Sequence, residues 1–359
     1  MDQLPRRRFL VGTGALIAAS VVPGGFALGQ RESRKLIDTH HHFYPPAYQK
    51  AWHEAGEDVS VVARGAHAQA IRERGLTLIA GETKRTVHVP CVDDPDELSA
   101  PDVVFVTVKQ THLPAMADSL SRMLGRGARV VLAMNGIPWW FADELPIPRH
   151  NSLVDELDPG GVLRGSIDTA RLIGAVVQSS NEVVAPGVVL STTPTRNRMI
   201  LGNVVARSDN RIPEVVAVLE HAGYGAWETT DIRRELWNKM VLYLAVSPIS
   251  TLTGLPLDKL VSDPGGYAVM TAVMREGIEI GRRLGFELAD DVDDRIGFYR
   301  DKATRPSMLK DFELGRDPEL ASGVLVFDTI AKALDLSAPH IAMMATLARL
   351  RFSSLRRDS

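Results

Sequence analysis

The feature that most constrains the fold is a run of apolar, mostly β-branched residues, DVVFVTVK, at positions 102–109. Strands of this kind are buried on both faces, which is typical of parallel sheets covered by helices. Further candidate strands lie at residues 58–63, 86–90 and 129–134. Because segments with helical spacing separate these strands, the pattern predicts a doubly wound α/β domain.

The C-terminal part of the chain has helical periodicity. Apolar residues recur at helical spacing in residues 267–284, 323–334 and 340–352. A chain of 359 residues also exceeds what one hydrophobic core usually serves. We therefore expect an α/β domain over residues 31–229, followed by an all-helical domain over residues 230–355.

The composition excludes some classes of partner. The net charge is -3 with 24% charged residues, which gives no electrostatic footprint for nucleic acid or for an anionic membrane. The single cysteine, Cys91, excludes an internal disulfide.

Residues 1–30 have the pattern of a signal segment. Arg6, Arg7 and Arg8 precede an apolar stretch at residues 11–22, and residues 27–29 offer a small-residue cleavage site. This order is typical of twin-arginine leaders. The apolar stretch is too short to cross a bilayer of roughly 30 Å, so we predict no integral membrane segment. The protein would be periplasmic if the leader is functional and cytoplasmic if the leader is inherited but non-functional.

A glycine pair inside this segment resembles the start of a dinucleotide-binding turn. Gly12 and Gly14 match the first two glycines of G-x-G-x-x-G, but Ile17 stands at the third position. A nucleotide-binding turn should also lead through one helix to the next strand, and the next long candidate strand begins only at residue 58. We therefore predict that this pair is a coincidence within the leader.

Residues 35–52, KLIDTHHHFYPPAYQKAW, resemble the opening of a metal-dependent amidohydrolase. In that class the first strand delivers an H-x-H pair to a divalent metal, and His40 and His42 match the pair. A catalytic metal needs further ligands from later strands, and no other histidine lies in a matching context. We predict no metal site, and an amidohydrolase fragment is the minor alternative.

One lysine lies in an otherwise apolar segment, RRELWNKMVLYLAVSPISTLTG, at residues 233–254. Burial of Lys239 in such a helix would lower its pKa and make the ammonium a usable proton donor. The alternative interpretation is that the lysine extends its methylenes along the helix and keeps its charge in water.

A second motif decides between these interpretations. The segment PSMLKDFELGRDPE at residues 306–319 follows ELWNK and SPISTLTG, and this order resembles the C-terminal domain of ketopantoate reductases (2-dehydropantoate 2-reductases). The resemblance extends over about residues 57–351. It implies that Lys239 is the general acid, that Glu319 holds the substrate and that Ser307 contacts the substrate carboxylate.

The same resemblance implies a Rossmann-like N-terminal domain that binds NADPH. Arg64 follows the candidate strand at 58–63, where a cation meets the adenosine 2′-phosphate. Lys109 and Asn135 match residues that lie beside the nicotinamide and the substrate. The first βα unit is atypical, because His40, His42 and Pro45 stand where the resemblance places the phosphate-binding glycines, if that unit begins near residue 36. Proline there removes an amide donor and imidazoles add bulk.

The implied reaction is the reduction of a small 2-keto acid, foremost 2-dehydropantoate. The family usually carries asparagines four and eight residues after the lysine, and here these positions hold Tyr243 and Ser247. Both side chains still form hydrogen bonds, and Ser247 remains a candidate substrate-binding residue. The bulk of Tyr243 leaves another 2-keto acid open. The main alternative is a catalytically silent relative that has lost its cofactor site, and a homodimer is left open.

Overall fold

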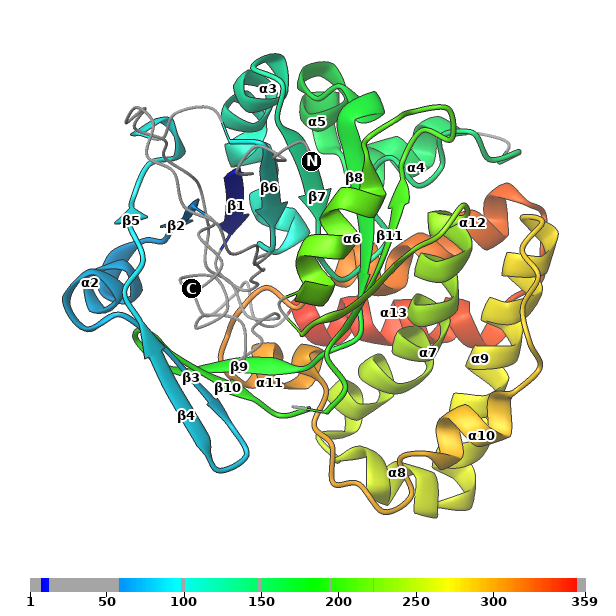
Figure 1. Cartoon of the computed structure of the whole chain (residues 1–359). Helices are drawn as coiled ribbons and strands as arrows, with labels where there is room; N and C mark the ends of the chain where they lie inside the picture. The colour runs from blue at the N-terminus through cyan, green and yellow to red at the C-terminus, as the bar shows by residue number, and fades with distance from the viewer. Residues whose placement is uncertain are drawn as a thin grey trace, which may run out of the picture. The chain divides into compact units, whose positions relative to one another are not determined.

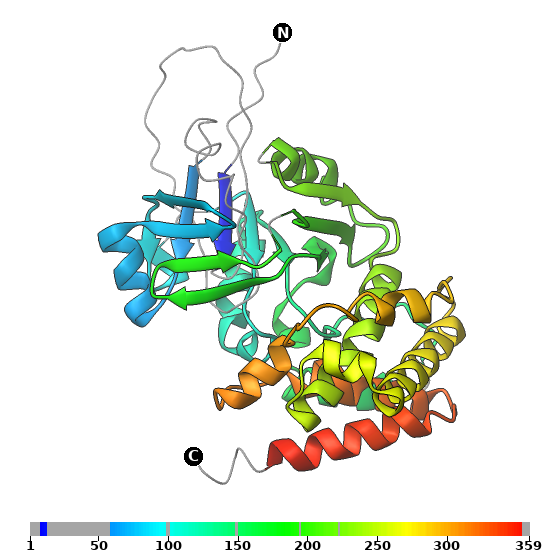
Figure 2. The same cartoon turned by 90° about the horizontal axis from the view of Figure 1, so that it is seen from below.

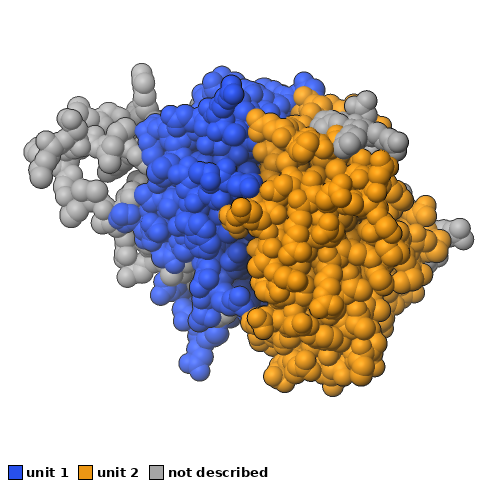
Figure 3. Space-filling view, turned by 90° about the vertical axis from the view of Figure 1, so that its right-hand side faces the viewer, with its two compact units in different colours: residues 1–134, 165–232 blue, residues 135–164, 233–359 orange. Residues whose placement is uncertain are grey.

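The computed structural model describes residues 8–12, 58–97, 101–147, 150–193, 195–221 and 223–353. The chain divides into two compact units, coloured separately in Figure 3. Unit 1 comprises Met1–Met134 and Gly165–Ile232, and unit 2 comprises Asn135–Arg164 and Arg233–Ser359, within the described ranges.

Unit 1 is built on an eight-stranded sheet with the order β12-β11-β8-β7-β6-β1-β2-β5 (Figure 1). Its strands are β1 (Arg8–Gly12), β2 (Asp58–Val62), β5 (Cys91–Val92), β6 (Val103–Val106), β7 (Arg129–Leu132), β8 (Leu172–Val177), β11 (Arg198–Asn203) and β12 (Gly225–Glu228). All neighbouring pairs are parallel except β8 and β11. The helices of this unit are α2 (Gly65–Arg74), α3 (Ala117–Gly125) and α6 (Ile212–His221).

The central strand of this sheet corrects the interpretation of the glycine pair. Arg8–Gly12 forms β1, with Phe9 in register with Val59 of β2 on one side and Val103 of β6 on the other. The chain therefore draws its first strand from the segment interpreted as a leader. The prediction gave too much weight to the length of the connection, residues 13–57. The length of the segment between two strands does not by itself exclude their pairing, because the entropic penalty of closure grows only logarithmically with length.

A smaller four-stranded sheet, with the order β4-β3-β10-β9, also belongs to unit 1. Its strands are β3 (Leu76–Ala80), β4 (Thr83–Val87), β9 (Asn181–Ala185) and β10 (Val188–Ser191). The candidate strand at residues 86–90 corresponds in part to β4, which is an exposed antiparallel strand of this sheet. Short 3₁₀ turns complete the chain at η1 (Pro95–Glu97), η2 (Gln110–His112), η3 (Pro114–Met116), η4 (Pro159–Gly161) and η5 (Thr169–Arg171).

Unit 2 is helical, as predicted for the C-terminal part, and its later helices are the yellow to red elements of Figure 2. In the described ranges, the helices of unit 2 are α4 (His150–Leu157), α7 (Ile232–Thr253), α8 (Leu257–Ser262), α9 (Pro264–Arg283), α10 (Val292–Gly297), α11 (Ser307–Glu313), α12 (Val326–Ala333) and α13 (Pro339–Ser353), with the π-helical turn η6 (Ala321–Leu325) before α12. The short helix α5 (Val162–Ser166) contains the position in the chain where unit 2 gives way to unit 1. The fold class, a doubly wound α/β unit and a helical unit, is confirmed.

The core of unit 2 holds α7 in place. Trp237 is fully buried and donates a hydrogen bond from Nε1 to the Gly277 carbonyl of α9 over 2.9 Å. Its ring packs against Phe141 and Phe327, with centroid distances of 5.6 and 4.7 Å. A Cβ on Gly281 would lie 2.3 Å from Trp237 Nε1, so the two helices meet at a distance that only glycine permits. The buried face of α7 is therefore fixed in rotation.

Candidate active site

Lys239 lies on α7 and donates a hydrogen bond from Nζ to Asn135 Oδ1 over 2.7 Å. Desolvation by burial lowers the pKa of this ammonium from 10.5 to about 8, and the negative charge of Glu319 opposes the decrease. The side chain of Lys239 is half-buried, so the structure lies between the buried lysine and the solvated lysine that the sequence left open. A partly deprotonated amine near neutral pH is suited to proton transfer, because its protonated form is both populated and acidic.

The turn that presents Asn135 lies in unit 2 and is hydrogen-bonded to η6. Gly136 has a φ of 85°, a left-handed conformation that glycine adopts without strain. The next amide, of Ile137, donates to the Ser322 carbonyl of η6 over 2.8 Å. The short N-G turn therefore holds the amide that faces Lys239.

Arg233 was missed by the sequence reasoning and holds the segment at residues 140–141, which follows the Asn135 turn. Its side chain is buried and donates from Nε to the Phe141 carbonyl over 3.0 Å and from one terminal nitrogen to the Trp140 carbonyl over 3.3 Å. The guanidinium also lies over the Trp140 ring at 5.3 Å. The repeated arginines at the start of the motif gave no signal of this role, because a helix N-terminus often carries solvated charges.

Glu319 is held in an unusual backbone conformation. Its side chain is buried, with 6% exposure, and its φ is 56°, which is costly for a residue with a Cβ. The amide of Glu319 donates to Asp317 Oδ1 over 2.8 Å, and its carbonyl accepts from the Gly323 amide over 3.0 Å. The π-helical turn η6 begins two residues later. Such turns occur frequently at functional sites.

Ser307 is the first residue of α11, and Tyr243 lies one turn after Lys239 on α7. The hydroxyl of Tyr243 forms a hydrogen bond with the Ser307 side chain. Burial, together with the charges of Glu319 and Asp311, raises the pKa of the Tyr243 phenol far above its ordinary value. The candidate residues Lys239, Asn135, Glu319 and Ser307 are therefore connected through direct contacts or short-range charge interactions.

Ser247 is the candidate residue for which the structure gives the least support. It is buried, with 2% exposure, and it lies eight residues after Lys239, about 12 Å along the helix axis. Its carbonyl accepts a hydrogen bond from the Thr251 hydroxyl over 2.8 Å. No printed contact joins its hydroxyl to the other candidate residues.

In unit 1, two cations follow the strands on either side of β1. Arg64 is exposed and stands at the N-cap of α2, after β2 ends at Val62. Lys109 is buried, with 3% exposure, and follows β6. The carboxyl ends of parallel strands are where nucleotides bind in such sheets. Basic side chains on this edge are suited to an anionic ligand.

Comparisons with known proteins identify the chain. Residues 231–351 match the family model "Ketopantoate reductase PanE/ApbA C terminal", and residues 50–139 match "Ketopantoate reductase PanE/ApbA". A 2-dehydropantoate 2-reductase from Mesorhizobium japonicum is 34% identical over 295 residues, which are 82% of this chain and 90% of that protein. The chain belongs to the ketopantoate reductase family.

Solved structures of this family share the fold. A protein from Ralstonia solanacearum assigned as a ketopantoate reductase is 31% identical, with a TM-score of 0.76, and the match covers 86% of this chain and 93% of that one. D-mandelate dehydrogenase in complex with NADH and anilino(oxo)acetate has a TM-score of 0.70 at 16% identity, covering 86% and 95% of the two chains. At that identity the second match shows the fold alone.

Several predictions about this ketopantoate reductase family member concern residues outside the described ranges. The amidohydrolase-like stretch, His40, His42 and Pro45 fall there, as does the turn that follows Gly12. Among the described residues, no group of three or more His, Cys, Asp or Glu side chains is placed to hold a metal. In those same ranges, no helix has the length and apolar character required to span a bilayer.

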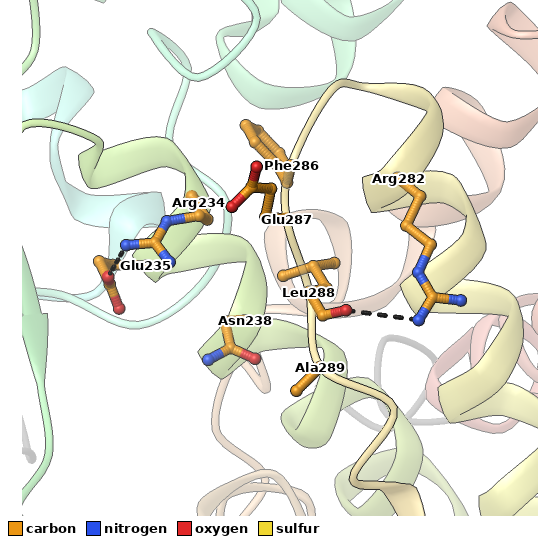
Figure 4. A pocket seen from close by; sticks show the side chains of 8 residues that line it. All are labelled: Arg234, Glu235, Asn238, Arg282, Phe286, Glu287, Leu288 and Ala289. Atoms are coloured by element: carbon orange, nitrogen blue, oxygen red, sulfur yellow. Dashed lines mark hydrogen bonds and ion pairs between the residues drawn. The ribbon is translucent and has the colours of Figure 1, made fainter.

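A pocket of about 560 Å³ lies in unit 2, away from the residues that the family resemblance assigns to the site (Figure 4). Side chains from α7, from the last turn of α9 and from the segment after α9 line it: Arg234, Glu235, Asn238, Arg282, Phe286, Glu287, Leu288 and Ala289. Arg234 is paired with Glu235, and Arg282 donates to the Leu288 carbonyl. Most of these side chains are solvated, and we assign no catalytic role to the pocket.

Proposed function

We propose that this protein uses NADPH to reduce a small 2-keto acid, foremost 2-dehydropantoate, to the 2-hydroxy acid. The observation that carries the proposal is Lys239, a half-buried residue whose ammonium donates to Asn135, interacts with the charge of Glu319 and has a pKa lowered to about 8. The relative from Mesorhizobium japonicum is a 2-dehydropantoate 2-reductase, which supports this choice of substrate.

The residues of unit 2 supply binding and proton transfer. NADPH, when bound, supplies the hydride for the C2 carbonyl. Lys239 donates its proton to the carbonyl oxygen as negative charge develops there, and its cation stabilises that charge. Glu319 accepts a hydrogen bond from a substrate hydroxyl and stabilises the lysine cation, while Ser307 binds the substrate carboxylate. Asn135 orients the lysine through the 2.7 Å hydrogen bond, and Ser247 contributes a further polar group.

The residues that would hold the cofactor lie mainly on the sheet edge of unit 1. Arg64 would pair with the adenosine 2′-phosphate, and its exposure leaves its guanidinium accessible to a ligand. Lys109 and Asn135 would contact the nicotinamide end. This donor set is cationic where NADPH is anionic, so the residues present fit the group.

The first experiment is a fluorescence titration of the complete chain with NADPH and, in parallel, with NADH. The complete chain is needed because residues 8–12 form the central strand. Micromolar binding with preference for NADPH, followed by turnover of 2-dehydropantoate, is the expected result. No binding up to millimolar cofactor would contradict the proposal and favour a catalytically silent relative. The Lys239→Ala variant should bind NADPH normally and lose turnover.

We further propose that residues 31–229 form the cofactor-binding domain and that residues 230–355 form the domain that binds the substrate and carries out catalysis. The site residues Lys239, Ser307 and Glu319 support the second assignment. Asn135 lies in unit 2 although it precedes residue 229, so the two assignments meet at this residue. The Asn135→Ala variant should therefore affect catalysis more than NADPH affinity.

We propose the twin-arginine leader as well, although the same residues that would form it include strand β1. Cleavage after residue 29 would remove β1 and leave β2 and β6 without their common neighbour. Export to the periplasm through the twin-arginine route therefore requires that the segment is retained. N-terminal sequencing of the protein isolated from its own host tests this, because a mature end near residue 30 would contradict a structural role of β1.

We also propose a homodimer. The solved structure of a dimeric ketopantoate reductase from Staphylococcus aureus shares the fold, with a TM-score of 0.63 at 13% identity. On α13, the red helix of Figure 2, Met343, Leu347 and Leu350 are all substantially exposed at helical spacing. Sedimentation equilibrium tests the proposal, and a monomer for the complete chain at assay concentration would contradict it.

A further inference from the structure

The ring of Tyr243 rests against the one glycine of the π-helical turn η6. A Cβ built on Gly323 would lie 2.9 Å from Tyr243 Cε1 and 3.6 Å from the hydroxyl oxygen. Contacts below 3.0 Å are essentially never seen for real Cβ atoms, so the ring occupies the space that any side chain at position 323 would need. Gly323 lies in the π-helical turn and does not have a positive φ. The absence of a side chain, rather than backbone freedom, is what this position contributes.

The other end of the Tyr243 ring is fixed by a polar contact. Its hydroxyl forms a hydrogen bond with the side chain of Ser307 at the start of α11. The acidic groups whose charges act on the phenol are Glu319, which precedes η6, and Asp311, one turn after Ser307 on α11. Lys239 lies one turn earlier on the helix that carries the tyrosine. The tyrosine thus connects three elements, α7, α11 and η6, at the residues that the proposed function assigns to the substrate.

We propose that Tyr243 is a positioning residue that holds the Ser307 hydroxyl in the orientation that binds the substrate carboxylate, with Gly323 as the seat of its ring. This inference rests on the proposed function, because it assumes that Ser307 contacts a carboxylate. The phenol is neutral at every working pH, since burial and two nearby carboxylates oppose its ionisation. A neutral hydroxyl can donate to the serine oxygen and leave the serine proton for the substrate.

The ring of Tyr243 stands where the family usually carries a smaller side chain. The family usually has an asparagine at this position, a shorter side chain whose amide cannot reach across the same space. In this chain the larger ring closes that space and relies on a side-chain-free position opposite. We therefore expect substrate binding to depend on the pair Tyr243 and Gly323, rather than on either residue alone.

The test measures steady-state kinetics of 2-dehydropantoate reduction by the complete chain, with NADPH saturating. Tyr243→Phe keeps the ring and removes the hydroxyl, and we expect its KM for the keto acid to rise about five- to tenfold with kcat within about twofold, the size of effect one neutral hydrogen bond gives. Tyr267→Phe is the matched control, since it removes a tyrosine hydroxyl that contacts Asp293 at the surface. The control should leave both constants unchanged.

A second set of variants displaces the Tyr243 ring by a substitution at Gly323 and leaves the tyrosine itself unchanged. Gly323→Ala should raise KM in the wild-type background and have little further effect in Tyr243→Ala, where the ring is gone. Gly297→Ala, at a helical glycine with nothing within 4 Å of a built Cβ, controls for the substitution itself. A wild-type KM in Tyr243→Phe, a fall in kcat at constant KM, or additive effects of the two substitutions would each overturn the inference. If the wild-type protein itself binds NADPH but reduces no 2-keto acid, the proposed function fails instead.

Discussion

The pKa of Lys239 makes a quantitative prediction about the pH dependence of the reaction. Burial lowers this pKa from 10.5 to about 8, which corresponds to a preference for the neutral amine on the order of 3 kcal/mol relative to a lysine in water. A general acid must carry its proton, so the rate should fall as pH rises through the pKa of the folded protein. About nine-tenths of the molecules are protonated at pH 7 and about one-tenth at pH 9 if the pKa is about 8. We therefore expect kcat/KM to fall nearly tenfold between these two pH values.

The assay is the initial rate of NADPH oxidation with 2-dehydropantoate well below KM, in buffers of constant ionic strength. Under this condition kcat/KM reports the ionisations of the free enzyme and is insensitive to slow product release. An unperturbed lysine, with a pKa near 10.4, would remain almost fully protonated at pH 9. The two cases therefore differ by nearly an order of magnitude at a single pH.

Two variants sharpen the assignment. Lys239→Met should lower kcat/KM by roughly 10²- to 10⁴-fold, the contribution of a general acid, and abolish the alkaline limb. Lys332→Gln removes an exposed lysine that pairs with Asp328 on α12 and should leave the profile unchanged. An alkaline limb near pH 10.5 in the wild type, or an unchanged limb in Lys239→Met, would refute the argument that this buried ammonium supplies the proton.

Three further predictions concern the charges and the packing around the site. Glu319→Gln removes a charge that raises the pKa of Lys239, so the alkaline limb of the pH profile should move to lower pH. Arg64→Ala should weaken NADPH binding about tenfold in the fluorescence titration and leave NADH affinity unchanged, since only NADPH carries the 2′-phosphate. Gly281→Ala should lower the free energy of unfolding by about 1–3 kcal/mol in denaturant titrations, because the added methyl overlaps Trp237. An unchanged limb, equal losses for both cofactors, or wild-type stability would contradict the respective argument.

The doubly wound unit could be predicted from sequence because its central strands are apolar on both faces. Val103–Val106 and Arg129–Leu132 are flanked by turns and helices that leave little choice of structure. The strand Arg8–Gly12 was missed for a physical reason, since an apolar run after arginines suits a leader as well as a buried strand. Only pairing with β2 and β6, which is tertiary information, separates the two. The second sheet was predicted only in part: the candidate strand at residues 86–90 overlaps its edge strand Thr83–Val87, whose exposed and polar residues lack the apolar pattern of a buried strand.

The candidate site was predictable where a residue contradicts its surroundings. Lys239 in an apolar helix is such a case. Glu319 is a second case, because a buried carboxylate requires a partner. The supporting residues gave no such signal. Arg233 resembles any charge at a helix start, and Gly323 resembles any helical glycine, although Arg233 binds the carbonyls of residues 140 and 141 and Gly323 accommodates the Tyr243 ring.

The cost of building this site is concentrated next to Glu319. This residue adopts a left-handed backbone, which costs on the order of 1 kcal/mol or more for a side chain with a Cβ, and the helix that follows starts with a π turn. The widened turn places the Ser322 carbonyl on the Ile137 amide and Gly323 beneath Tyr243. An ordinary α-helical turn would shift these two groups around the helix axis. The backbone strain at Glu319 therefore accompanies the π turn, and that turn positions the Asn135 turn, the helix that carries Lys239 and Ser307 of α11 relative to one another within unit 2.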